Sequence, residues 1–385
     1  MQVNQIVYRL GQAIPTLPDS DPQLILLFGN QAAQQMLPLL QQHYPEAIIS
    51  GCSTGGEIYD YSVQDDIATI TLLSFQHTRV QLFSDQVSKP QDSYYCAQQL
   101  AQQARADDLQ HILMLVDGMT VNAQEVVSGV RSTLSPFNSI TGGVAGDGDR
   151  FETTFTYQQQ GISSQRIQLI GFYGQQLTVH CGCHGGWDTF GPMRRVTRAK
   201  GTRLYEVDGQ SALKLYQRYL GDYAKDLPGS GLRFPLQVRR NEQNNNPVVC
   251  TVFGIDEADD CLIFAREIPE GAITQLMSAN LDRLIDGAQT ASEQACRTTS
   301  TNQHSNTLAP STTAAQFALL ISCVGRRAVL QQLVDEELET LSETLCQPIP
   351  HCGFYSYGEI APNLGVGPCN LHNQTMTITT FAERE

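Results

Sequence analysis

The first stretch of apolar and polar segments predicts a strand–helix–strand unit. An apolar run, Leu24–Phe28, is followed by a helical stretch to about Gln42, a short strand Ala47–Ser50 and a longer strand from Ile67 to Phe75. Short apolar runs bounded by turn residues are typical of buried strands, and apolar positions three and four residues apart are typical of helices.

The same order of segments returns near the C-terminus. Phe317–Ile321 is a strand-like run, a helix with a long apolar stripe is expected at about Arg326–Cys346, and Thr375–Ile378 alternates as a strand does. A second long helix is expected at about Ile273–Gln289. The repeated order indicates an internal duplication.

A third, looser copy lies between these two. Ile112–Val116 precedes a helix with apolar residues between Val126 and Leu134, and strands are expected at Phe151–Tyr157 and Ile167–Tyr173. We therefore predict a mixed α/β fold of tandem sheet-bearing units, internally duplicated, with helices on the outer faces.

The expected boundary between the two regions lies in the segment Pro228–Asn246, which is rich in proline, glycine and asparagine. It divides the chain into residues 1–235 and 247–385. Within the second region, Cys296–Thr313 contains nine Ser or Thr among 18 residues and includes His304, so we expect an exposed loop there.

Glycine-rich segments follow a strand in all three copies: Gly51–Ile58, Gly142–Gly148 and Gly353–Ile360. Glycine in a turn permits positive φ and lets backbone N–H groups approach a ligand. Because pockets in layered α/β folds gather at strand ends, the three turns are expected to share a ligand site, or else only to reverse the chain. The candidate ligand-binding residues are Cys52, Ser53, Thr54, Gly142, Gly143, Asp147, Phe354, Tyr355 and Ser356.

Charge and composition exclude several classes of partner. A formal net charge of −15 argues against nucleic acid and against anionic membranes, and no apolar run is long enough to span a bilayer. The 11 cysteines show no regular spacing and no leader segment precedes them, which favours reduced thiols in the cytoplasm. Between Trp187 and Arg240, 11 Lys or Arg face 5 Asp or Glu. This basic stretch could seat an anionic ligand or pair with acidic neighbours.

An enzyme alternative rests on Ser53. Gly51–Gly55 matches the G-x-S-x-G pattern of serine hydrolases and follows a strand. That pattern requires a helix directly after the serine, whereas here the chain continues through Glu57 and Ile58 toward another strand. A hydrolase using Ser53 is therefore the weaker hypothesis, and we expect a non-enzyme.

Taken together, these motifs resemble the FIST sensory family from about Gln23 to Phe381. The resemblance rests on the segments Gly51–Ile58, Gly142–Gly148, Trp187–Gly191 with Val196–Arg198, Glu206–Gly209 and Gly353–Pro362. It implies signal input by small-molecule binding inside the cell. Since no kinase, cyclase or receiver segment is visible, the signal should pass to a separate transmitter protein.

The organisation is also similar to the NosP group of FIST proteins. That similarity implies haem as cofactor, nitric oxide as the sensed gas and a sensor histidine kinase as the partner in a two-component system. The alternative is a FIST sensor without haem, which binds an amino acid or another small metabolite.

Haem would need an axial donor, an apolar wall and cations near its propionates. His184, the candidate metal ligand, and His180 flank Cys181-Gly182-Cys183, close to Trp187 and ahead of Arg194 and Arg198. His351, before the last glycine-rich segment, is the second choice. Covalent haem attachment requires two residues between the cysteines, and zinc would require further ligands, so neither alternative is favoured.

Overall fold

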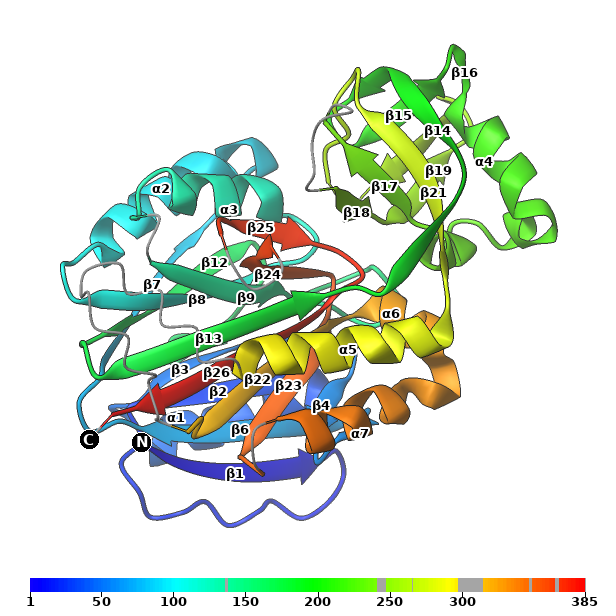
Figure 1. The fold of residues 1–385 in the computed structure, drawn as a ribbon. Coiled ribbons are helices and arrows are strands. Elements are labelled where there is room, and N and C mark those ends of the chain that lie inside the picture. Colours follow the sequence, from blue (N-terminus) through cyan, green and yellow to red (C-terminus); the bar gives the residue numbers. More distant parts are fainter. Residues whose placement is uncertain are drawn as a thin grey trace, which may run out of the picture.

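The computed structural model describes residues 1–135, 138–240, 247–264, 266–296, 314–345, 348–363 and 367–384. The predicted loop Cys296–Thr313 lies outside this description beyond its first residue, and His304 with it. Three six-stranded mixed sheets form the body of the molecule, and a smaller domain projects from it (Figure 1).

The first sheet has the strand order β1-β6-β2-β3-β10-β11. Its strands are β1 (Gln2–Arg9), β2 (Leu24–Gly29), β3 (Ile48–Cys52), β6 (Ile67–Ser74), β10 (Thr156–Gln158) and β11 (Gly161–Ser163). The second sheet has the order β7-β12-β8-β9-β24-β25. Its strands are β7 (Arg79–Gln86), β8 (Leu109–Val116), β9 (Ser139–Val144), β12 (Arg166–Tyr173), β24 (Gly358–Pro362) and β25 (Cys369–His372).

The third sheet has the order β13-β26-β22-β23-β4-β5. Its strands are β4 (Glu57–Tyr59), β5 (Ser62–Gln64), β13 (Leu177–His184), β22 (Phe317–Cys323), β23 (His351–Ser356) and β26 (Met376–Glu383). The three sheets thus repeat one layout, in which the central strands β2–β3, β8–β9 and β22–β23 are parallel pairs. All three copies of the repeat are confirmed.

Each repeat donates a hairpin to the sheet of another repeat. The hairpin β4–β5 pairs with β23, β10–β11 pairs with β3, and β24–β25 pairs with β9. The exchange is cyclic, so each sheet is completed by residues from a different part of the chain. The three repeats therefore interlock rather than fold as separate units.

Alternation along the central strands sets the layers of the core. In β2, Leu24, Leu26 and Phe28 face inward, where they meet residues of β8 and β22, while Ile25 and Leu27 face outward. Successive side chains of a strand point to opposite faces, so a fully buried run such as β2 requires cover on both sides. The inner core fills the space between the three sheets.

Helices cover the outer faces of the sheets (Figure 1). The helix α1 (Gln31–His43) packs on the first sheet, and α2 (Ser93–Ala104) and α3 (Ala123–Arg131) pack on the second. The third sheet is covered by α5 (Leu281–Cys296), α6 (Val324–Leu330) and α7 (Val334–Thr344), with the 3-10 turn η4 (Gln331–Leu333) between the last two. The predicted mixed α/β class with outer helices is confirmed.

Residues 187–279 form the projecting domain, here called the inserted domain because it lies between β13 and α5 (Figure 1). It has its own apolar core. The expected boundary at residues 235–247 falls inside this domain. Its elements are β14 (Trp187–Lys200), β15 (Arg203–Val207), β16 (Gln210–Ser211), α4 (Ala212–Leu220), η2 (Gly221–Asp226), η3 (Gly229–Arg233), β17 (Leu236–Arg239), β18 (Val248–Cys250), β19 (Val252–Asp256), β20 (Cys261–Phe264) and β21 (Ile273–Ala279).

Two predicted helices differ from the structure. The segment predicted as helical at Ile273–Gln289 is the strand β21 followed by α5. The spacing of Ile273, Leu276 and Met277 fits a helix, but pairing of this segment with β14 and β17 decides its conformation. The helix predicted at Arg326–Cys346 is interrupted at Gln331, which has a positive φ of 51°.

Of the helices in the described ranges, none is long and apolar enough to cross a membrane. Among the described residues, nine cysteines are free and buried, whereas Cys296 takes part in a disulfide bond.

Candidate functional site

The loops that follow β3, β9 and β23 meet at one end of the three sheets. We call this contact region the junction. Backbone hydrogen bonds join the three loops: Gly55 N–H donates to Tyr355 O (2.7 Å), Gly146 N–H to Ser53 O (3.0 Å) and Tyr357 N–H to Val144 O (3.1 Å). These N–H groups are therefore occupied by the protein itself.

The nine residues predicted to bind a ligand are all buried in or beside the junction. Their role in ligand binding stays a prediction. Two pockets in the described part of the chain are lined by other side chains. The hydrogen bonds and buried residues of the junction pack the three repeats against one another.

Three glycines assigned to turns from the sequence lie inside strands instead. Gly51, Gly142 and Gly353 belong to β3, β9 and β23. In each case a Cβ atom would overlap the backbone carbonyl of the neighbouring parallel strand, at Leu27, Met114 and Leu320 respectively. Close strand packing, rather than a turn, explains these glycines.

Ser53 has a structural hydrogen bond in the junction. Its Oγ accepts the Phe155 N–H at 2.9 Å, its side chain is buried, and the strand β4 follows the loop. The arrangement lacks the helix that a nucleophile elbow needs directly after the serine. No hydrogen bond joins Ser53 to a histidine within the described residues.

Two glutamates occupy equivalent positions at the junction. Glu57 accepts a hydrogen bond from Thr54 Oγ1, and Glu359 accepts one from Ser356 Oγ at 2.8 Å. Burial raises the pKa of Glu57 to about 8 and that of Glu359 to about 7. The middle repeat has Ala145 and Gly148 at the matching places, so this carboxylate is absent there.

Asp147 organises the loop after β9. Its carboxylate accepts the backbone N–H groups of residues 151, 152 and 153 at 2.9 Å and the Tyr357 hydroxyl. Burial opposes ionisation of Asp147, but these hydrogen bonds together lower its pKa. The ring of Phe151 stacks on Tyr357 at 4.7 Å and contacts Phe253 of the inserted domain at 5.3 Å.

Gln374 links the body to the inserted domain. Its side-chain Nε2 donates to Leu232 O (3.0 Å) and to Thr251 Oγ1 (3.2 Å), both in the inserted domain. Its backbone oxygen accepts the indole N–H of Trp187 at 2.9 Å and a longer bond from Arg326. One body residue thus joins three segments of the inserted domain.

Arg326 is fully buried beneath this link. It forms an ion pair with Glu337, and its guanidinium also donates to the backbone oxygens of Gly185 and Leu284 (2.7 Å to the latter). Tyr355 donates to the other Glu337 oxygen at 2.9 Å. Gly185 and Leu284 flank the two connections through which the chain enters and leaves the inserted domain.

The predicted haem donors lie in the body. His180 and His184 are partly buried on β13, and burial lowers the pKa of both rings. His351 begins β23, at the end of that strand away from the junction, and its Nδ1 lies 3.1 Å from Ile349 O. Among the described residues, no group of three or more His, Cys, Asp or Glu is placed to hold a metal ion.

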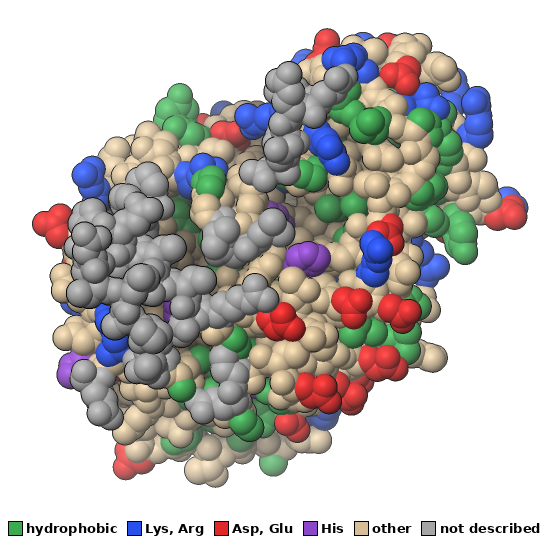
Figure 2. Space-filling view, in the orientation of Figure 1, with side chains coloured by type: hydrophobic (Ala, Val, Ile, Leu, Met, Phe, Trp, Pro, Cys, Tyr) green, Lys and Arg blue, Asp and Glu red, His purple; other side chains and the backbone are tan. Residues whose placement is uncertain are grey.

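The predicted cations lie in the inserted domain, apart from these histidines. Arg194 pairs with Asp208 at 3.0 Å, and Arg198 pairs with Glu206 at 2.9 Å. Pairing with acidic neighbours was one of the two interpretations of the basic stretch. Lys and Arg side chains are prominent on the inserted domain in the face shown in Figure 2.

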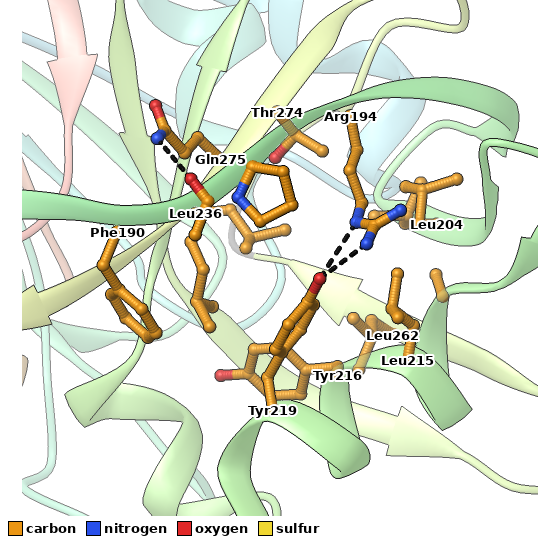
Figure 3. A pocket seen from close by; sticks show the side chains of 15 residues that line it. Phe190, Arg194, Leu204, Leu215, Tyr216, Tyr219, Leu236, Leu262, Thr274 and Gln275 are labelled. Atoms are coloured by element: carbon orange, nitrogen blue, oxygen red, sulfur yellow. Dashed lines mark hydrogen bonds between the residues drawn. The ribbon is translucent and has the colours of Figure 1, made fainter.

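The inserted domain contains an apolar pocket of about 40 Å³ between β14, β15, β21 and α4 (Figure 3). At its rim, the guanidinium of Arg194 donates two hydrogen bonds to the Tyr219 hydroxyl oxygen, from Nη2 at 2.6 Å and from Nε at 3.2 Å. The lining residues are Phe190, Gly191, Pro192, Arg194, Leu204, Val207, Ala212, Leu215, Tyr216, Tyr219, Leu236, Leu262, Thr274, Gln275 and Leu276.

Arg194 was singled out from the sequence, but the other lining residues were missed. Most are apolar residues of strands or of α4, which look like ordinary core positions in a sequence. The available signal was the cluster of Tyr216 and Tyr219 close to the basic stretch, since aromatic and cationic side chains together are common in ligand sites.

Comparison with known protein families identifies two domains in this chain. Residues 23–210 match the FIST N domain, and residues 212–362 match the FIST C domain. The point where the two matches meet lies at the start of α4, inside the inserted domain.

An uncharacterized protein of Methanocaldococcus jannaschii is 23% identical over 278 residues, which cover 66% of this chain and 52% of the relative. The match thus spans about half the length of that relative. Two solved structures show weak likeness. A chorismatase matches with a TM-score of 0.38 and 7% identity, over 99% of this chain and 98% of its own. A cyanuric acid hydrolase from A. caulinodans matches with a TM-score of 0.35 and 9% identity, over the full length of both chains.

TM-scores this low give no information about the function of this chain. The two domain matches follow one another over nearly the whole chain, and together with the motifs they support one assignment: the chain belongs to the FIST family.

Proposed function

We propose that the protein is a small-ligand sensor whose ligand binds in the apolar pocket of the inserted domain. FIST domains bind small ligands in signalling proteins. We place the ligand there because the pocket has an apolar interior and one polar, charged corner, which Arg194 and Tyr219 form. Sites for small molecules commonly have this composition, because apolar contacts supply affinity and a few polar groups fix orientation.

The contacts between the inserted domain and the body provide a route for the signal. The pocket residue Phe190 lies on the same strand as Trp187, whose indole is bonded to Gln374. A ligand can shift a conformational equilibrium only if it contacts the two states differently. Movement of β14 on ligand binding would change the Trp187 and Gln374 contacts, and with them the exposed surface offered to a transmitter protein.

Ala212→Leu tests the placement of the ligand. Ala212 is 2% exposed and lines the pocket, so three added carbon atoms should occupy the space meant for ligand. We expect metabolites that raise the melting temperature of the wild-type protein to lose that effect in the variant, because ligand binding stabilises the folded state by mass action. Thermal unfolding with a metabolite panel measures this.

The control is Ala258→Leu, which adds the same side chain at an exposed position of the same domain. That variant should respond to ligand as the wild type does. If Ala212→Leu keeps the full ligand response while remaining folded, the ligand site lies elsewhere and the placement is wrong.

A second candidate is a haem-based nitric-oxide sensor that regulates a histidine kinase. The observation in its favour is His184 Nδ1, which is buried and has no hydrogen-bond partner in the described part of the chain. Bound haem would supply a ferrous iron that binds nitric oxide, and His184 would be its axial donor. The residues expected to pair with the propionates, Arg194 and Arg198, are engaged by acidic partners in the inserted domain.

An absorption spectrum of protein expressed with ample haem tests this candidate. A Soret band that is lost in His184→Ala and kept in His351→Ala would support it, and colourless protein would exclude it.

A further inference from the structure

The rim of the pocket has one charged lining residue, Arg194, and its donors are only partly used. A guanidinium has five N–H donors. Two of the bonds formed by Arg194 go to the Tyr219 hydroxyl and one goes from Nη1 to Asp208 Oδ2 at 3.0 Å. Two donors therefore remain for a further acceptor, on a side chain that is 24% exposed.

The charge of Arg194 selects among ligand classes. Asp208 pairs with Arg194 at 3.0 Å and offsets part of its charge, but the two remaining N–H donors can form charge-assisted hydrogen bonds with a carboxylate. Phosphate groups are usually held by several donors, and among the described residues no lysine or second arginine lines the pocket. An anion with a single carboxylate matches the donors that are present.

The interior limits the apolar part of the ligand. Leu204 and Leu262 are each 1% exposed and form the floor together with Leu215. The pocket has a volume of about 40 Å³. Its apolar interior therefore suits a small, compact apolar group.

The mouth of the pocket contains an irregular segment of β14. Phe190 pairs with Leu276 and Arg194 pairs with Thr274, so Gly191, Pro192 and Met193 all lie opposite the single residue Gln275. Gln275 Nε2 holds Gly191 O at 2.8 Å (Figure 3). The pairing of β14 with β21 is therefore irregular where β14 lines the pocket.

We infer that the ligand is a short, branched or compact monocarboxylate, with its carboxylate on Arg194 and its apolar group between Leu204, Leu215 and Leu262. This inference rests on the proposed function, since it assigns a chemical class to the same pocket. In this arrangement Arg194 selects the charge of the ligand, and the pocket volume selects the size of its apolar group.

Three probes test the class by calorimetry on the full chain. They are 3-methylbutanoate, its neutral analogue of nearly equal shape 3-methylbutanamide, and the long-chain dodecanoate. We expect 3-methylbutanoate to bind at least about tenfold more tightly than the amide, because a hydrogen bond to a charged group is worth more than a tenfold change in affinity. Dodecanoate should gain nothing from its longer chain.

Arg194→Gln should reduce affinity for 3-methylbutanoate by about tenfold or more and leave the amide unchanged. The matched control is Arg198→Gln, on the same strand, whose guanidinium pairs with Glu206 and does not line the pocket. It should leave the affinity for both probes unchanged.

Equal affinity for the acid and the amide, or no loss in Arg194→Gln, would overturn the carboxylate class. If the amide alone binds and Ala212→Leu abolishes that binding, the class is wrong while the proposed function stands. If 3-methylbutanoate binds to Ala212→Leu as tightly as to the wild type, both the class at this pocket and the placement fail.

Discussion

Gly51→Ala is expected to be among the most damaging single substitutions in this protein. A Cβ atom on Gly51 would overlap the backbone carbonyl of Leu27 on the adjacent parallel strand β2. The obstructing atoms are backbone, so relief requires separating β2 from β3 rather than rotating a side chain. We expect a loss of about 3–5 kcal/mol in the free energy of unfolding, at the upper end for a single substitution.

Urea unfolding followed by far-UV circular dichroism measures this loss. Gly229→Ala is the matched control, because Gly229 is exposed, has no atom within 4 Å of an added Cβ and begins a 3-10 turn. The control should be neutral within about 0.5 kcal/mol. The equivalent glycines Gly142 and Gly353 should behave as Gly51 does. Wild-type stability in Gly51→Ala would show that the parallel strands of the first repeat are spaced differently.

Arg326→Met is expected to be comparably damaging for an electrostatic reason. Arg326 and Glu337 are each fully buried, and the arginine also satisfies the backbone oxygens of Gly185 and Leu284. Removing one partner leaves the Glu337 carboxylate buried without its cation, which typically costs about 3–5 kcal/mol. The unfolding free energy should fall by that order.

Two variants separate this explanation from simple loss of packing. Arg198→Met removes an exposed ion pair with Glu206 and should cost at most about 1 kcal/mol. Adding Glu337→Leu to Arg326→Met removes the stranded charge and should recover part of the lost stability. If the double variant is no more stable than Arg326→Met, the carboxylate is not the source of the loss.

The repeat layout could be predicted because its central strands carry strong local patterns. Leu24–Phe28, Ile112–Val116 and Phe317–Ile321 are apolar at successive positions, as strands covered on both faces must be. The resemblance to the FIST family rested in part on segments near the ends of these strands and in part on segments of the inserted domain. The domain matches confirm it.

The exchange of hairpins between repeats could not be predicted from the local sequence pattern. Glu57 pairs with Phe354, almost 300 residues away along the chain, and neither segment differs in pattern from one that pairs within its own repeat. Partner choice among strands is decided by the packing of the whole core, and periodicity reports only that a strand exists.

The pocket was beyond prediction for a related reason. Its walls come from β14, β15, β17, β20, β21 and α4, and most of the lining residues are apolar, with a pattern that predicts an ordinary core. The strand β21 was interpreted as a helix, so its contribution could not be seen. Arg194 could be singled out by charge, but its position at the rim depends on the fold of the inserted domain.

Trp187 provides the most direct test of the claim that the body responds to occupancy of the pocket. It is the only tryptophan of the chain, and its indole N–H is bonded to Gln374 O at the connection between the two parts. The measurement is Trp187 emission during titration with 3-methylbutanoate, or with any metabolite that stabilises the wild type but not Ala212→Leu. We expect a saturable change in emission with the same midpoint as binding by calorimetry. Saturated binding with no change in Trp187 emission would contradict it.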